Sequence, residues 1–337
     1  MGKVPENYIT IIEDDDGQRF DRWVKKRVPA MPYGLAQKLI RKGAFKIDGK
    51  KAKADVKLSA GQQVRIPAYE VNEASKSGEK AAPRVSDRDA AFVRSLVIYD
   101  EGGIIAINKP GDLAVQGGTG QKRYLDAMLP ALADKDGVVP RLVHRLDKDT
   151  SGVMLLARSA KMAKALGEMF KTRAMRKIYW AMTRGVPEPR DGTIKAHLIK
   201  AGGLNQERMV VDPENGKYSE TEYTVMDFAH VQAAFVAFWP RTGRTHQIRV
   251  HAELLGTPIV GDGKYSGRHY DPPLEPFDAS GVSDVLHLHA RRLRFEHPIT
   301  HKPVDITAPL PPTLTKGWKA LGFNAKDNSD PFEDLDL

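Results

Sequence analysis

The feature that most constrains the fold is an unbroken apolar run, residues 153–157, that directly follows a cluster of charges. The run has the length of a strand and no polar residue, as is typical of a buried strand. Arg145, Asp147, Lys148 and Asp149 come immediately before it. Removing unpaired charges from water costs several kcal/mol, so charges at the mouth of a buried strand indicate a functional site. For any one of them alone, a solvated surface turn is the alternative.

The size and composition of the chain exclude several classes of protein. Its 337 residues are enough for two domains, each with its own core. The absence of cysteine excludes disulfides, thiolate metal sites and a cysteine nucleophile. No apolar run approaches the ~20 residues of a membrane span, and the polar residues 1–6 contain no signal-peptide core. We therefore expect a cytoplasmic protein that does not enter a membrane.

Positive charge is concentrated near the amino terminus. The whole chain has a net charge of +9, whereas residues 18–53 hold twelve lysines and arginines against two aspartates, a balance of +10. The remainder of the chain is therefore close to neutral. Such a concentration is typical of a module that binds nucleic acid, because a charge that serves only solubility is spread more evenly.

Residues 18–68 have the pattern of a small domain with two helices and short strands. Helices are predicted over 19–28 and 33–42, and Asp48 with Gly49 predicts the turn of a hairpin. The layout resembles the S4 RNA-binding domain, although a solvated pair of basic helices is the alternative. The candidate RNA contacts are five basic residues, Arg22, Lys38, Arg41, Lys42 and Lys46.

The rest of the chain is predicted to hold a linker, a larger domain and a tail. Residues 69–90 are small, polar and aperiodic, as in a linker. In residues 91–323 many strand patterns alternate with few helices, which favours a mixed, mostly antiparallel sheet over a doubly wound parallel one. Residues 324–337 carry five acids against one lysine and are predicted to be a disordered acidic tail. The predicted fold class is α+β.

Three separated motifs in the larger domain together resemble the RluA-type pseudouridine synthases. They are HRLDKDTSG at residues 144–152, KIY at 177–179 and TGRTHQIRVH at 242–251. Their order, together with the S4-like domain, is closest to the RluC-like branch that acts on large-subunit ribosomal RNA. The sequence departs from the pattern at Gln116, where we expect His; the difference concerns RNA contact or substrate choice.

The resemblance implies an isomerase that converts uridine in RNA to pseudouridine. Such an enzyme breaks the N1–C1′ bond, turns the base and rejoins it through C5. The reaction involves no net redox change, so we expect no cofactor and no metal. The expected partner is large-subunit ribosomal RNA or a pre-ribosomal particle, with no obligatory protein partner.

The resemblance also gives roles to single residues. Asp147 is the nucleophile or ion-pairing carboxylate, and whether it attacks sugar or base stays open. Arg244 offsets its charge with a planar guanidinium. Tyr179 offers the base an aromatic face and a phenol near C5. Because the target base must leave the helix stack, Arg145 is implied to insert into the vacated space.

Two other functions fit parts of the sequence. Asp147 to Thr150 matches the nucleophile loop of haloacid-dehalogenase-type phosphatases. In those enzymes, however, the loop follows a strand of a parallel sheet, whereas here it precedes the apolar run. A non-catalytic RNA-binding protein would explain the S4-like domain but leaves Asp147, Tyr179 and Arg244 without a role.

Overall fold

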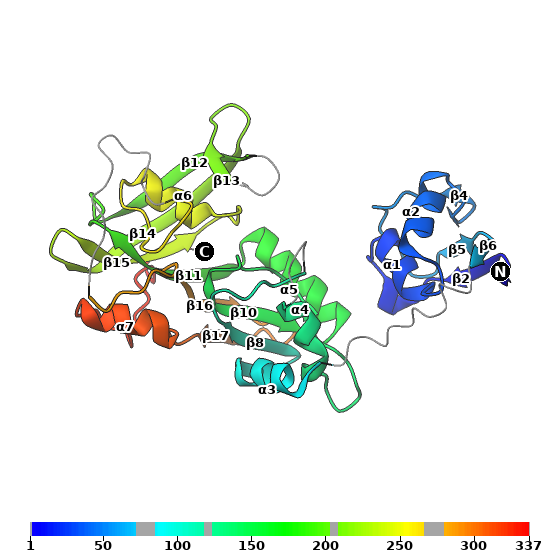
Figure 1. Cartoon of the computed structure of the whole chain (residues 1–337), viewed down its shortest axis with the longest axis horizontal. Coiled ribbons are helices and arrows are strands. Elements are labelled where there is room, and N and C mark those ends of the chain that lie inside the picture. Colours follow the sequence, from blue (N-terminus) through cyan, green and yellow to red (C-terminus); the bar gives the residue numbers. More distant parts are fainter. Residues whose placement is uncertain (1, 72–84, 118–122, 203–207, 266–279, 337) are drawn as a thin grey trace. The chain divides into compact units, whose positions relative to one another are not determined.

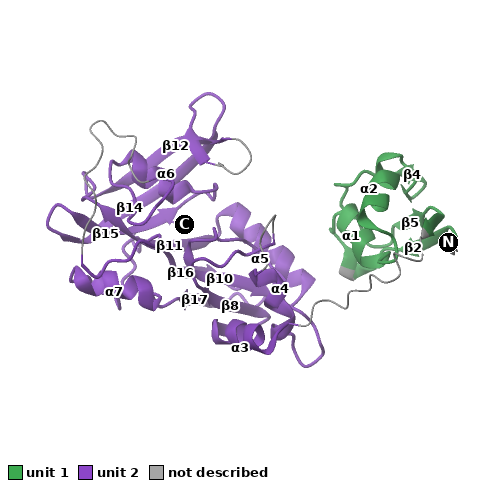
Figure 2. Ribbon diagram, viewed as in Figure 1, with its two compact units in different colours: residues 1–84 green, residues 85–337 purple. Residues whose placement is uncertain are grey.

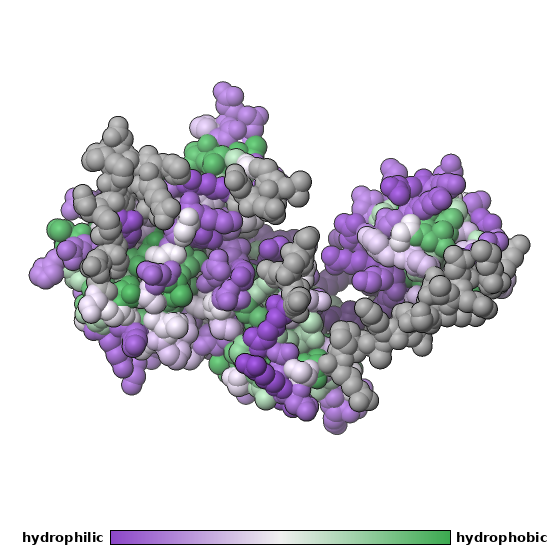
Figure 3. All heavy atoms as spheres, in the orientation of Figure 1, coloured by the Kyte–Doolittle hydropathy of each residue, from purple (hydrophilic) through white to green (hydrophobic). Residues whose placement is uncertain are grey.

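Figure 1 shows the computed structural model of the chain, which describes residues 2–71, 85–117, 123–202, 208–265 and 280–336. The chain divides into two compact units, residues 1–84 and 85–337 (Figure 2). Each unit has a hydrophobic core of its own. Within the described ranges, no helix is long and apolar enough to cross a membrane. Hydrophilic residues cover most of the face seen in Figure 3, and apolar residues form scattered patches.

In its described part, the smaller unit folds as two helices against a four-stranded sheet with strand order β2-β5-β3-β4. Both predicted helices are present, and Asp48 and Gly49 form the predicted hairpin turn with φ angles of 47° and 79°. Its elements are β1 (Gly2–Val4), β2 (Asn7–Thr10), the 3-10 helix η1 (Glu13–Asp15), α1 (Phe20–Arg27), α2 (Tyr33–Arg41), β3 (Lys46–Ile47), β4 (Lys50–Lys51), β5 (Gln63–Ile66) and β6 (Tyr69–Val71).

The smaller unit extends beyond the predicted 18–68 domain on both sides. β2 adds an edge strand to the sheet, and β1 pairs with β6 in antiparallel fashion. The acidic run before α1 is also part of the fold, because the buried carboxylate of Asp15 accepts hydrogen bonds from Trp23 Nε1 (3.0 Å), Lys26 (3.0 Å) and Arg27 (2.8 Å). The first helix of the larger unit, α3 (Asp87–Ser95), starts inside the predicted linker.

The larger unit is built on one sheet that is antiparallel except for the pairing of β10 with β16. This arrangement confirms the predicted α+β class. The strand order is β13-β12-β14-β15-β11-β16-β10-β8-β7. Its elements after α3 are β7 (Val97–Glu101), β8 (Ile104–Lys109), α4 (Leu125–Met128), η3 (Leu129–Leu132), β9 (Arg141–Leu142), β10 (Ser151–Ala157), α5 (Ala160–Thr172), β11 (Met175–Arg184), β12 (Asp191–Ala201), β13 (Arg208–Val211), β14 (Lys217–Ala229), β15 (Ala233–Pro240), α6 (Gln247–Leu254), β16 (Leu288–Glu296), β17 (Pro303–Thr307) and α7 (Pro312–Ala320).

Alternate side chains of β11 pack against different helices. Ile178 and Trp180 belong to a core cluster that contains Trp318 of α7. Tyr179 and Ala181 pack in a second cluster that contains residues of α6. Since successive side chains of a strand point to opposite faces, α6 and α7 cover opposite faces of the sheet. Figure 1 shows α6 and α7 on either side of β11 and β15.

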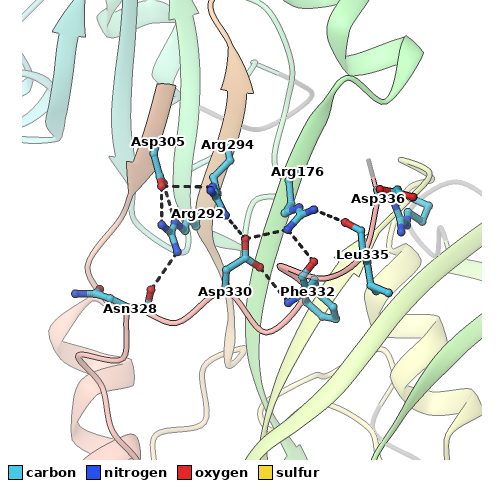
Figure 4. A network of polar contacts seen from close by, with 10 residues as sticks. Arg176, Arg292, Arg294, Asp305, Asn328, Asp330, Phe332, Leu335 and Asp336 are labelled. Atoms are coloured by element: carbon cyan, nitrogen blue, oxygen red, sulfur yellow. Dashed lines mark hydrogen bonds and ion pairs between the residues drawn. The ribbon is translucent and has the colours of Figure 1, made fainter. Parts of the chain in front are cut away.

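The carboxyl-terminal residues 324–336 are packed against the sheet, which differs from the predicted disordered tail. Arg176 of β11 and Arg294 of β16 both pair with the buried carboxylate of Asp330, at 3.1 and 2.6 Å (Figure 4). The Phe332 side chain is buried in the core on the same face. An acidic residue of this segment therefore pairs with arginines of the sheet. Asp330 lies 154 positions from Arg176 in the sequence.

Candidate active site

A cavity of about 360 Å³ opens in the larger unit between three segments that lie far apart in the sequence. They are the loop before β10, the start of β11 and the connection between β15 and α6. Arg145, Asp147, Tyr179 and Arg244 all line this cavity. Ligand-binding cavities measure about 300–1,000 Å³, so the volume suits one nucleotide base and not a duplex.

The Asp147 loop is held by the packing of β10. Leu146 is buried, and the backbone N–H of Thr150 donates to the Asp147 carbonyl oxygen at 3.2 Å. Gly152 has a φ of 115°, and a Cβ there would lie 2.2 Å from the backbone oxygen of Ala290. Only glycine therefore allows β10 to pair closely with β16 at this point. The side chain of Asp147 keeps 26% of its surface exposed at the cavity.

A buried lysine, which the sequence analysis did not single out, holds the same loop through hydrogen bonds. Lys109, at the end of β8, donates hydrogen bonds to the backbone oxygens of Pro110 (2.8 Å), Leu113 (3.0 Å) and Lys148 (2.9 Å). Three carbonyl acceptors suit the three N–H groups of an ammonium. Burial lowers the pKa of Lys109 to about 7, against the opposing effect of nearby carboxylates, first that of Asp149.

Tyr179 reaches the cavity from a distorted point of β11. The pairing of β11 with β16 shifts register between Ile178 and Tyr179, and such bulges re-aim side chains beside functional sites. Burial raises the pKa of the Tyr179 phenol, and the charge of Asp147 raises it further. The phenol is therefore protonated at neutral pH and can donate a hydrogen bond in the cavity.

His144 and Lys177 form another wall of the cavity. The His144 ring stacks on Phe170 at 4.1 Å, and its Nε2 accepts a hydrogen bond from the N–H of Leu155 at 2.8 Å. Burial, helped by Lys177, lowers the pKa of His144 to about 3, so the ring is neutral. Lys177 is buried too, and its pKa falls to about 8 through burial and then the charge of Arg173.

The turn before α6 is fixed by one buried amide. The Gln247 Oε1 accepts from Thr242 Oγ1 (2.6 Å) and from the Arg244 N–H (3.0 Å), and its Nε2 donates to the Glu220 oxygen (2.9 Å). The helix begins at Gln247, with His246 as its N-cap residue. The buried amide therefore orders the turn from inside.

Two arginines line the cavity at different depths. Arg244 is exposed on the rim, and its Nε donates to the Tyr218 carbonyl oxygen at 3.0 Å. Arg249 is buried and makes two hydrogen bonds of 2.6 Å to Asp262. Burial would lower the pKa of Arg249, but Asp262 and then Asp147 raise it, with a net increase. The charge of the buried Arg249 guanidinium therefore interacts with that of Asp147. The sequence analysis did not single out Arg249. An arginine between two apolar residues, Ile248 and Val250, was the available signal.

The predicted RNA contacts of the smaller unit lie on its surface. Arg22, Lys38, Arg41 and Lys42 are exposed, and Lys46 on β3 is half-buried. In the larger unit Arg145 is exposed at the cavity rim, and Gln116 is exposed as well. Four of the five predicted RNA contacts in the smaller unit are thus accessible to a ligand.

Comparisons with known proteins show the family to which the chain is similar. The family model described as RNA pseudouridylate synthase matches residues 103–254, a range that contains all three motif segments. Ribosomal large subunit pseudouridine synthase C of Vibrio vulnificus is 35% identical over 314 residues, which are 93% of this chain and 96% of the relative. The protein of the same name from Escherichia coli K12 is 34% identical over 313 residues, again 93% and 96% of the two chains.

A solved structure shares the fold of the larger unit. Human RNA Pseudouridylate Synthase Domain Containing 4 is 28% identical, with a TM-score of 0.58 over 69% of this chain and 97% of the human one. Neither the phosphatase nor the purely RNA-binding alternative receives support from these comparisons. The chain therefore belongs to the RNA pseudouridylate synthase family and is an RNA pseudouridine synthase.

Proposed function

We propose that the chain isomerises specific uridines of large-subunit ribosomal RNA to pseudouridine, with Asp147 as the reacting carboxylate. The observation that carries the proposal is the position of Asp147, partly exposed in a cavity that Tyr179 and Arg249 also line. Two relatives that are similar over nearly the whole chain are named ribosomal large subunit pseudouridine synthase C.

In the proposed reaction, Asp147 makes and later releases a bond to the sugar or the base while the N1–C1′ bond breaks. The base turns, C5 bonds to C1′, the released Asp147 carboxylate takes the proton from C5, and N1 gains a proton, so that the overall reaction is an isomerisation. Arg249 lines the same cavity and supplies a positive charge that interacts with the charge of Asp147. The resting phenol of Tyr179 is protonated, so it packs on the base and donates a hydrogen bond rather than acting as a free base.

The exposed arginines act on the RNA instead of on the reacting atoms. We propose that Arg244, held at the rim by the Tyr218 carbonyl, meets a phosphate, because it lies outside the buried charge network. Arg145, also on the rim, takes the space of the extruded base. The exposed basic residues of the smaller unit bind the same RNA and supply salt-dependent affinity.

The natural substrate is the ribosomal RNA itself or a pre-ribosomal particle in the cytoplasm, and no other protein is needed for the reaction. Pseudouridine mapping of ribosomal RNA from cells with and without the protein tests this assignment. We expect loss of particular sites in large-subunit RNA and their return with the wild-type chain but not with Asp147→Asn. Missing sites in transfer RNA alone would contradict the substrate.

A further inference from the structure

A buried tyrosine lies behind the catalytic cavity, and its hydroxyl group has two hydrogen-bond partners among the residues that the structure describes. Tyr265 is 0% exposed, and its Oη lies 2.7 Å from the Met209 backbone nitrogen and 2.9 Å from His246 Nδ1. The Met209 N–H can only donate, so the tyrosine oxygen accepts there. Within the part of the chain that the structure describes, His246 Nδ1 is thus the acceptor left for the hydroxyl proton.

This bond determines which nitrogen of His246 carries the proton. A neutral imidazole that accepts at Nδ1 is protonated at Nε2. His246 Nε2 lies 3.8 Å from Asp147 Oδ2. With the proton on Nε2, the ring presents a donor to the carboxylate; with the proton on Nδ1, it would present a lone pair to a negative charge.

The surroundings favour the neutral ring. Burial lowers the pKa of His246, Asp147 acts in the opposite direction, and Arg249 and Lys264 lower it further, while Asp262 raises it. The net direction is downward, so the ring is neutral at neutral pH. Its single N–H then has to be placed by a hydrogen bond, and Tyr265 provides that bond.

The backbone of His246 gives independent evidence of a constrained position. It has a φ of 53°, in the left-handed region that side chains other than glycine seldom occupy. The ring meets the edge of Tyr265 at 5.5 Å and 78°. A strained backbone that aims a ring at a catalytic carboxylate is typical of a position kept for function.

We infer that His246 is a positioning residue for Asp147, and that Tyr265 sets its tautomer. The inference rests on the proposed role of Asp147. The 3.8 Å separation is longer than a hydrogen bond, and catalytic contacts of this kind tighten when substrate fills the site. The Nε2–H then fixes the direction of the Asp147 carboxylate toward the nucleotide.

Nitrogen-15 NMR of the wild-type chain, labelled at histidine, measures the tautomer directly. The His246 signals are identified by their loss in His246→Gln. We expect the Nε2–H tautomer, and an Nδ1–H tautomer would overturn the proposal. This measurement needs no substrate, so it is independent of whether the chain modifies ribosomal RNA.

Single-turnover kinetics on a ribosomal RNA fragment test the positioning role. Tyr265→Phe should lower the rate about 10–100-fold, the range for losing a group that orients a histidine, with RNA affinity within about twofold of wild type. The matched control is Tyr223→Phe, which removes a tyrosine hydroxyl that is bonded to the Pro189 oxygen at 2.9 Å, away from the cavity.

A conservative replacement separates positioning from folding. The amide N–H of His246→Gln can replace the Nε2–H, so this variant should recover most of the rate that His246→Ala loses. Equal losses in both, or a wild-type rate in Tyr265→Phe, would overturn the positioning role. If the wild-type chain itself forms no pseudouridine, the proposed function fails, and the NMR result still decides the tautomer.

Discussion

Two neighbouring residues of β11 show how differently the two faces of the sheet use charge. Arg176 and Lys177 are both only 8% exposed. Arg176 pairs with Asp330 and donates to the Phe332 oxygen at 2.7 Å (Figure 4). The Lys177 side chain lines the cavity and makes no hydrogen bond or ion pair with any described residue. The face of the sheet that packs against residues 324–336 uses its charge to hold the fold. The face that lines the cavity leaves the charge of Lys177 available to a ligand.

Two aspartates differ in the same way, and a substitution of one of them has the largest expected effect on the reaction rate. Asp330 is 3% exposed between arginines, and Asp147 is 26% exposed in the cavity. Asp147→Asn should lower the single-turnover rate by about 10³-fold or more, because it removes the reacting group. RNA affinity and the melting temperature should stay close to wild type. More than a tenth of the wild-type rate in this variant would remove Asp147 from the reaction.

The Arg176–Lys177 pair itself predicts changes of opposite sign in stability. Arg176→Met should destabilise the larger unit by about 3 kcal/mol, because it breaks a buried pair. Lys177→Met should stabilise it by a similar amount at pH 7, since its folded pKa of about 8 lies below the unfolded value of about 10.4. That gain should vanish as pH rises from 8 to about 10.4, where both states of the wild type lose the proton.

Urea denaturation of both variants at pH 7 and pH 10 checks these signs. Lys177→Met should also weaken RNA binding and flatten its salt dependence by roughly 0.7–0.9 per lost phosphate contact. Arg176→Met should leave binding unchanged at a temperature where it is folded. Equal destabilisation of the two variants would contradict the different use of charge on the two faces.

Two arginines of the cavity sharpen the contrast between reaction and RNA contact. Arg249→Lys keeps a charge near Asp147 but loses the paired geometry with Asp262, and we expect a rate loss of about 10²-fold. Arg244→Lys should change the rate less than tenfold and act mainly on RNA affinity. Single-turnover rates at saturating RNA, with circular dichroism to confirm folding, distinguish the two. A larger rate loss for Arg244 would return the charge-offsetting role to it.

Local sequence was sufficient to predict several helices and strands and to indicate the loop before β10 as part of a functional site. The apolar run of β10 and the charges before it indicated a functional site, the family resemblance gave Asp147 its predicted role, and the Asp48–Gly49 turn predicted a hairpin. These features depend on neighbours within a few residues. Their physical causes, burial of a strand and a left-handed turn, act over the same short range.

The missed features all depend on partners far away in the chain. Arg249 finds its partner Asp262 13 positions along the chain, and His246 finds Tyr265 19 positions along it. The acidic tail composition predicts disorder in isolation, because its charges have no visible partners in sequence. Arg176 and Arg294, on strands far upstream, supply those partners. Long-range pairing of this kind cannot be deduced from composition or periodicity.

Arg145 and Lys148 lie three residues apart in the loop before β10, and both are exposed. Arg145 lines the cavity, whereas the Lys148 ammonium pairs with Asp112 at 2.7 Å. An extruded base leaves a gap in the stack, and a flat guanidinium can fill it by stacking on the neighbouring bases. Arg145 can do so while Asp147 faces the base, since alternate residues of an extended segment point to one side.

Arg145→Ala should therefore slow the reaction on a stable stem about tenfold more than on RNA whose target uridine is already unpaired, because only the stem must be opened. Lys148→Ala is the matched control and should have little effect on either RNA. Single-turnover rates on the two substrates, at saturating enzyme, measure the ratio. Equal losses on both would show that Arg145 serves general binding or the chemistry, because a residue that replaces the extruded base matters only where a base has to be extruded.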